Sequence, residues 1–272
     1  MEIKAGLRKI CESYGKSRQG YYKRERIEQK REEERRKILR AVYVIRFKQP
    51  KVGVKKLHRM LRVKGVEVGR DRLYEVMREE GLIIKRKRSK RTTNSNHGFR
   101  KYKNLIKGKE IRGAEEVFVS DITYILTRER YTYLSLITDI WSRKIVGYCL
   151  SISLSVEGSI KALKMALRGR KKGIIHHSDR GIQYCCNAYV DILEKHGAKI
   201  SMTEENHVYE NALAERVNGI LKDEFMLGQE LPSYETAKKI VKEAIETYNN
   251  ERIHMSIEYK TPAQKHAEMV EV

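Results

Sequence analysis

The sequence predicts an all-α region followed by an α/β domain in which helices flank a mixed five-stranded sheet. Two patterns indicate this fold class. Apolar residues recur at helical spacing as far as about residue 84, whereas strand-like runs begin near residue 112 and later alternate with helices. The charge is divided at about the same point, since residues 1–110 carry a net charge of +23 and residues 111–272 one of −1, within a total of +22.

The first helices are expected within residues 1–48. A helix over 7–14, a turn at Gly15 and a helix over 17–22 capped by Ser17 are typical of a helix-turn-helix, whose second helix enters the major groove of DNA. A plain helical hairpin is the alternative. A highly charged helix over 24–41 and a further helix ended by Pro50 are expected to follow.

A second pair of helices is predicted over Val54–Val63 and Arg70–Glu79, each with one apolar stripe. We expect this pair to form a small helix-turn-helix-like domain. The basic run over 85–104 contains few aliphatic residues, which indicates a linker lying along a phosphate backbone, with Phe99 and Tyr102 fixing it in place.

The α/β domain is expected to begin with three antiparallel strands, over 116–125, 131–138 and 144–151. The first two form a hairpin across Thr127–Arg130. Helices and strands then alternate, and the elements expected in order are helix 156–168, strand 173–177, helix 182–197, strand 199–203 and helices over 210–226 and 233–250. The combination of antiparallel strands with later alternation predicts a mixed sheet.

Three carboxylates stand out in this domain. Asp121 lies within a largely apolar run, Asp179 follows a short strand, and Glu215 lies on a predicted helix with 35 residues between it and Asp179. A strand-edge aspartate, a turn aspartate and a solvated glutamate are the structural alternatives. If the three converge, their oxygens can hold two hard divalent cations, as in-line displacement at phosphorus requires.

The segments around these carboxylates carry recognisable motifs. They are, in order, DITY at 121–124, DIWSRKIVG at 139–147, HSDRGIQY at 177–184, ENALAER at 210–216 and YNNER at 248–252. Together they resemble the transposases of bacterial insertion sequences with a retroviral-integrase-like core, in particular the second-reading-frame product of the IS-three family. The resemblance extends from about residue 5 to residue 266. The function of YNNER is not evident from its chemistry.

This resemblance implies a ribonuclease-H-like fold and an enzyme that cleaves the ends of its own element and joins the 3′-hydroxyl to DNA by transesterification. It implies the catalytic and metal-binding residues Asp121, Asp179 and Glu215, with two Mg²⁺ ions for which Mn²⁺ can substitute. It also implies double-stranded DNA as partner, a homo-oligomer on paired ends, and fusion to the product of the upstream reading frame. The expected domains are 1–48, 49–84, the linker 85–110, the catalytic core 111–228 and a C-terminal segment 229–272.

Basic side chains are the expected contacts with DNA. Lys222, seven residues after Glu215, matches a basic position of the family that contacts terminal DNA. The other candidates are Arg216, Arg18, Arg70, Arg72, Lys85, Arg86, Lys87 and Arg88. His177 is expected to orient DNA or a neighbouring group. A DNA-binding regulator descended from a transposase and a nuclease that only hydrolyses are the alternative functions.

Two other acidic residues are expected to lie outside the metal site. Asp139 is expected to be structural and paired with Arg143. Glu224 lies about 180° around the helix from Glu215 at roughly 100° per residue, so we expect its replacement by Gln to leave activity near normal.

Composition excludes several classes of protein. No apolar run reaches the roughly 18 residues of a membrane span, and the N-terminus lacks the layout of a signal peptide, which predicts a cytoplasmic, nucleoid-associated protein. The four cysteines have no zinc-site spacing, so a zinc domain is not expected.

Overall fold

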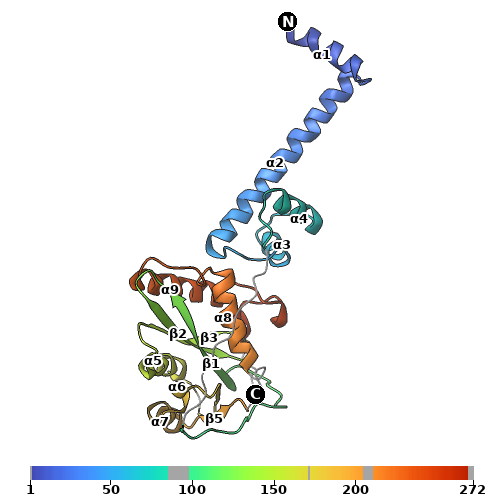
Figure 1. The fold of residues 1–272 in the computed structure, drawn as a ribbon. Coiled ribbons are helices and arrows are strands. Elements are labelled where there is room, and N and C mark those ends of the chain that lie inside the picture. Colours follow the sequence, from blue (N-terminus) through green and yellow to red (C-terminus); the bar gives the residue numbers. More distant parts are fainter. Residues whose placement is uncertain (1, 85–97, 171, 205–210, 269–272) are drawn as a thin grey trace. The chain divides into compact units, whose positions relative to one another are not determined.

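The computed structural model describes residues 2–84, 98–170, 172–204 and 211–268. The chain forms two compact units, one of residues 1–47 and 52–85 and the other of residues 48–51 and 86–272. Figure 1 shows that the first is helical and that the second contains the sheet. Among the described residues, no helix has both the length and the apolar character of a membrane span.

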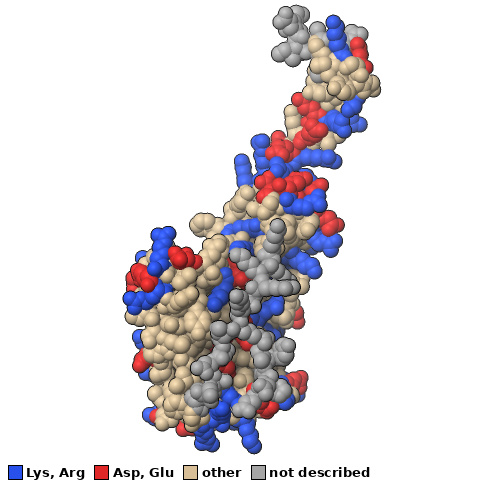
Figure 2. All heavy atoms as spheres, viewed as in Figure 1, with Lys and Arg blue, Asp and Glu red and all other residues tan. Residues whose placement is uncertain are grey.

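The first unit begins with helix α1 (Glu2–Ser13) and the long helix α2 (Arg18–Lys48). Gly15, with φ of 62°, forms the turn between them, and the Ser17 hydroxyl accepts a hydrogen bond from the backbone N–H of Gly20 at 3.0 Å, as expected for a cap. The separate helices predicted between residues 17 and 48 form one continuous helix. Charged side chains of both signs follow one another along α2 (Figure 2), and i,i+4 ion pairs such as Arg36 with Glu32 support the helix.

The second half of α2 packs against helices α3 (Val54–Val63) and α4 (Arg70–Glu79), which confirms the predicted helix pair. Their shared core contains Ile38, Val42, Ile45, Val52, Leu57, Leu61, Leu73, Val76 and Met77. By contrast, Ile10, Tyr14, Tyr21 and Tyr22 remain exposed near the turn between α1 and α2. The helix-turn-helix interpretation of residues 7–22 stays a prediction.

The second unit is built on a mixed five-stranded sheet, as predicted, with strand order β3-β2-β1-β4-β5. The first three strands are antiparallel, and β4 and β5 continue the sheet in parallel with β1. The strands are β1 (Val117–Leu126), β2 (Tyr131–Asp139), β3 (Ile145–Ser151), β4 (Ile175–Ser178) and β5 (Lys199–Met202). The predicted hairpin is confirmed, since Thr127 and Arg130 close it through backbone and hydroxyl hydrogen bonds.

Helices cover both faces of this sheet (Figure 1). They are α5 (Val156–Leu167), α6 (Ile182–Cys185), α7 (Asn187–His196), α8 (Ala212–Glu224), α9 (Tyr234–Asn250) and α10 (Pro262–Ala267), with a 3₁₀ turn at Met255–Ile257. The single helix expected over 182–197 is interrupted because Cys186 adopts an extended conformation. Helix α10 was not predicted, although Thr261 and Gln264 form a capping box around Pro262.

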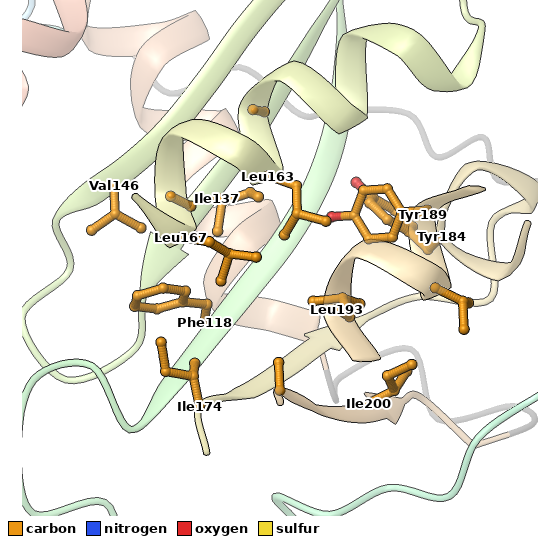
Figure 3. Close-up of a cluster of buried hydrophobic side chains, with 14 of the residues drawn as sticks. Phe118, Ile137, Val146, Leu163, Leu167, Ile174, Tyr184, Tyr189, Leu193 and Ile200 are labelled. Carbon is orange, nitrogen blue, oxygen red and sulfur yellow. The ribbon is translucent and has the colours of Figure 1, made fainter. Parts of the chain in front are cut away.

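Each face of the sheet has its own apolar core. On one side, side chains from the sheet meet those of α5, α6 and α7, and Figure 3 shows Phe118, Leu163, Tyr189 and Leu193 among them. On the other side, α8 and α9 contribute Val217, Leu221, Ile245 and Tyr248. Helix α8, which carries Glu215, is therefore held against the sheet by its apolar side chains.

Candidate active site

The parallel pairing of β1 with β4 places the two aspartates side by side. Ser120 on β1 pairs with Ser178 on β4. Asp121 directly follows Ser120, and Asp179 directly follows Ser178. Asp179 thus lies just beyond the C-terminal end of β4, which is where ligands commonly bind in sheets with parallel strands. This register brings together two carboxylates that are separated by more than fifty residues in the sequence.

The backbone that follows β4 holds the carboxylate of Asp179. The N–H of Gly181 donates to its Oδ1 at 3.0 Å. A Cβ at Gly181 would lie 2.9 Å from the same oxygen, so any larger residue would displace the carboxylate. The HSDRG motif therefore has glycine at position 181 because the Asp179 carboxylate lies too close for a side chain there. The sequence alone did not indicate this reason.

Helix α8 approaches Asp121 through Asn218. Its Nδ2 donates to Asp121 Oδ2 at 2.7 Å, while the backbone N–H of Ile122 donates to Oδ1 at 2.9 Å. Asn211, at the start of the helix, donates to the carbonyl of Ser120 at 3.1 Å. Because Glu215 lies one turn before Asn218, the helix presents the glutamate on the face that meets β1. Asn218 was not among the site residues predicted from the sequence.

The electrostatics of Asp121 reflect its surroundings. Burial, the nearby charge of Asp179 and, less strongly, that of Glu215 together raise the pKa of its carboxyl to about 7, against the lowering effect of the hydrogen bonds from Ile122 and Asn218. Burial also lowers the pKa of the Lys222 ammonium, although Asp121 opposes this shift. Asp121 therefore lies within electrostatic range of Asp179, Glu215 and Lys222, and Glu215 is exposed.

The donor set of this site suits a hard cation, since all its members are carboxylate oxygens. In the described part of the chain, however, no group of three His, Cys, Asp or Glu residues is arranged closely enough to hold a metal ion. Helix α8 starts directly after residues 205–210, which lie outside the described residues. The assignment of Asp121, Asp179 and Glu215 as metal ligands therefore stays a prediction.

A buried polar layer supports the strands beneath the aspartates. The His176 Nε2 lies 2.7 Å from the Ser120 hydroxyl and 2.9 Å from that of Tyr189, and burial lowers its pKa to about 3, which keeps the ring neutral. His177 is fully buried, with Nδ1 2.8 Å from the Ser201 hydroxyl. The side chain of His177 is therefore buried beside Ser201, and its expected role in orienting DNA or a neighbouring group stays a prediction.

Asp139 is structural, but its expected pairing with Arg143 is wrong. Its carboxylate is fully buried and accepts hydrogen bonds from the backbone N–H groups of Glu115 and Ser142, both at 2.7 Å. The Arg143 guanidinium donates instead to the carbonyl of Ile140 at 2.6 Å. Backbone N–H groups therefore satisfy the hydrogen-bonding capacity of Asp139 in place of the expected arginine.

Glu224 also has a structural partner, which changes one expectation. Both of its carboxylate oxygens accept hydrogen bonds from Arg252, each at 2.8 Å, and the arginine side chain is 4% exposed. Replacement of Glu224 by Gln would leave a buried guanidinium partly unpaired, which is costly. The substitution is thus no longer expected to be silent, even though Glu224 faces away from the carboxylate site.

The proposed DNA-binding side chains are only partly described. Arg216 and Arg18 are exposed and Lys222 is half-buried. Arg70 forms an ion pair with Asp71 at 2.9 Å and Arg72 one with Glu75 at 2.7 Å, both near the surface. Lys85, Arg86, Lys87 and Arg88 lie outside the described residues.

Two comparisons of sequence identify the family. Models described as integrase core domain match residues 112–207 and 196–262. The 31 kDa protein of insertion element IS600 from Shigella sonnei, itself named as uncharacterized, is 37% identical over 262 residues, which cover 93% of this chain and 96% of that protein. The chain belongs to the insertion-sequence transposases that carry an integrase core. It is a DDE-type DNA transposase, a polynucleotidyl transferase.

Further similarities agree with this assignment. The transposase resembles InsF of insertion sequence IS3A from Escherichia coli strain K12, with 36% identity over 145 residues that cover 52% of this chain and 50% of InsF. A chain of the simian T-cell lymphotropic virus intasome structure aligns with a TM-score of 0.50 and 18% identity, covering 77% of this chain and 70% of that one. The latter likeness concerns the fold alone, which is ribonuclease-H-like as the motifs predicted.

Proposed function

We propose that Asp121, Asp179 and Glu215 bind two Mg²⁺ ions, for which Mn²⁺ can substitute, and that this transposase cleaves and joins DNA at that site. The parallel register that sets Asp121 beside Asp179, with α8 bonded to Asp121 through Asn218, carries the proposal; the pKa of Asp121, raised by burial and then by the charges of Asp179 and Glu215, supports it. Without a cation, this arrangement costs free energy. A divalent ion would offset the repulsion, and the all-oxygen donor set suits magnesium.

When bound, the two ions would supply activation of the attacking oxygen and stabilisation of the leaving oxygen. The protein's own contribution is positioning. Asn218 and the N–H of Ile122 fix both oxygens of Asp121, and Gly181 fixes Asp179. Lys222 lies close enough to Asp121 to be influenced by its charge, so it is suited to hold the phosphate of a DNA strand beside the carboxylates.

The proposed reaction has two steps at phosphorus. Water first attacks the phosphodiester at the end of the element, and the bond to the 3′-oxygen breaks, which releases a 3′-hydroxyl. That hydroxyl then loses its proton and attacks a second phosphodiester, forming a new P–O bond while the bond to the former 3′-oxygen of that strand breaks. The number of phosphodiester bonds is conserved in this step, so it needs no external energy source.

DNA partners and assembly belong to the same proposal. Arg216 and Lys222 would contact the DNA end, while Arg18, Arg70, Arg72 and the basic run from Lys85 to Arg88 would contact phosphates elsewhere on the duplex. We propose that the transposase forms a homo-oligomer on paired element ends and that it is fused to the product of the upstream reading frame. We also propose that it acts in the cytoplasm, in association with the nucleoid. The five-part division at residues 48, 84, 110 and 228 also remains a proposal.

Glu215→Gln tests the catalytic assignment. The amide keeps the size of the side chain but removes the charge that would bind a cation, so we expect cleavage and joining of labelled element ends to fall by at least about 10³-fold while end binding survives. Asp223→Asn is the matched control, because Asp223 is an exposed acid on the same helix. It should retain near-normal activity in the same Mg²⁺ buffer.

The products of this assay distinguish the competing functions. Joined strands identify a transposase, cut strands without joining a nuclease, and bound but intact DNA a regulator. Full activity in Glu215→Gln, or loss of activity in Asp223→Asn, would show that the third ligand has been misassigned.

A further inference from the structure

The YNNER motif at residues 248–252 joins three parts of the second unit. The Tyr248 hydroxyl donates to the carbonyl of Arg143 at 3.0 Å. The Asn249 side chain both accepts from the N–H of Ile145 at 2.9 Å and donates to its carbonyl at 3.0 Å. Arg252 binds Glu224 in the last turn of α8. We call Tyr248, Asn249 and Arg252 the C-terminal latch.

The contact of the latch with α8 is geometrically specific. Arg252 forms two parallel 2.8 Å hydrogen bonds with Glu224 from a guanidinium that is almost fully buried. The ring of fully buried Tyr248 lies 5.7 Å from the guanidinium carbon and limits its movement. A buried ion pair contributes little net stability, but its fixed fork geometry defines one relative position of its two partners.

The latch also contacts the sheet, and this contact links α8 to the strand that carries Asp121. Asn249 hydrogen-bonds the first residue of β3 as a neighbouring strand would. Strand β3 pairs with β2, and β2 pairs with β1, where Leu136 lies opposite Asp121. The latch thus fixes the C-terminal end of α8 relative to the sheet that carries the first aspartate.

We propose that Arg252 and Asn249 are positioning residues that orient α8 so that Glu215 and Lys222 face Asp121. This inference rests on the proposed function of Glu215. Glu224 lies nine positions after Glu215, which is about 13 Å along a helix, so a tilt of about 5° at the latch moves Glu215 by roughly 1 Å. A displacement of that size in a catalytic group can reduce a rate by about 100-fold.

Arg252→Lys in the full-length protein tests the proposal. Lysine keeps the positive charge but cannot form the two parallel hydrogen bonds with Glu224. We expect a folded protein in which strand joining is slowed about 10- to 100-fold and the half-saturating Mg²⁺ concentration is raised several-fold. Mn²⁺ binding without DNA, measured by titration calorimetry, should weaken in parallel. Glu224→Gln should shift the Mn²⁺ affinity in the same direction, and it provides a second variant if Arg252→Lys does not fold.

A stability control separates positioning from simple loss of fold. Leu167→Ala removes a buried side chain from the core on the opposite face of the sheet. At a temperature where it and Arg252→Lys are both folded, the control should keep the wild-type Mg²⁺ dependence. Equal Mg²⁺ and Mn²⁺ affinities in Arg252→Lys and in the control would overturn the latch proposal.

The proposed function and the latch can fail separately. If Glu215→Gln is inactive but Arg252→Lys binds metal as the control does, the carboxylate assignment stands and the latch is wrong. If Glu215→Gln is active, the carboxylate assignment itself fails. The latch is then wrong as well, because it would orient no ligand.

Discussion

At the scale of single residues, Asp121 shows how a reactive site costs stability. Its carboxyl has a pKa of about 7 in the folded protein, against an ordinary value of 3.8. Between these values the folded protein retains a proton that the unfolded chain has lost. The free energy of unfolding contributed by this group therefore falls as pH rises from about 4 to 7, and it stays low at higher pH.

Asp121→Asn should consequently stabilise the metal-free protein. We expect a gain on the order of 1–3 kcal/mol at pH 8 that shrinks as the pH is lowered toward 4, because the amide carries no charge to bury. Thermal unfolding followed by circular dichroism in EDTA at several pH values measures this gain. Added Mg²⁺ should raise the melting temperature of the wild type and not that of the variant; identical melting curves at pH 8 would contradict the pKa assigned to Asp121.

At the scale of elements, Gly147 sets how closely β3 approaches α5. A Cβ there would collide with the carbonyl oxygen of Ala162 and would lie 2.9 Å from the Cβ of Ala166. We expect Gly147→Ala to reduce the free energy of unfolding by about 1–3 kcal/mol, since backbone must move to accommodate one methyl group. Urea unfolding provides the measurement.

The same substitution on α8 should have the opposite sign. Gly219 lies within the helix and has no heavy atom within 4 Å of an added Cβ. Gly219→Ala should therefore stabilise the protein by about 0.5–1 kcal/mol through helix propensity. Equal effects of the two substitutions would mean that β3 and α5 are not in close contact.

The elements also show which features could be predicted from the sequence. The strands of the second unit and the helix of Glu215 were predicted to within a few residues, because apolar spacing records which face is buried. The prediction of separate helices in place of α2 was wrong. The charged residues between the predicted helices show no apolar spacing that would indicate one continuous helix. The partners of Arg252, Asn218 and His177 depend on tertiary contacts between distant segments, and no local pattern specifies them.

At the scale of the whole molecule, DNA affinity should follow the uneven charge. Binding to duplex DNA should weaken with salt, with log K falling by about 0.9 per unit of log salt for each phosphate contacted. Replacing Lys85, Arg86, Lys87 and Arg88 together by Ala should make this slope shallower by about 0.9 for each phosphate that the variant no longer binds. Fluorescence anisotropy of a labelled element end at several salt concentrations measures the slope.

A matched set of cations exists in the second unit. Lys164, Arg168 and Lys195 line a depression of about 420 Å³ between α5 and α7, and Lys199 is the first residue of β5. Replacing these four by Ala removes the same charge, but we expect the slope to stay near the wild-type value. A larger change in this set than in the linker set would locate the main DNA contact near α5 and α7.

The Asn249 amide also covers part of the edge of the sheet. Strand β3 ends the sheet on one side, and Asn249 occupies the hydrogen-bonding groups of its first residue. On the other side, the carbonyl of Lys103 accepts from the N–H of Met202 on β5 at 3.4 Å. Exposed strand edges invite pairing with other chains, and segments that cover them prevent it. A strand from another copy of this transposase therefore finds the pairing groups of Ile145 and the N–H of Met202 already occupied.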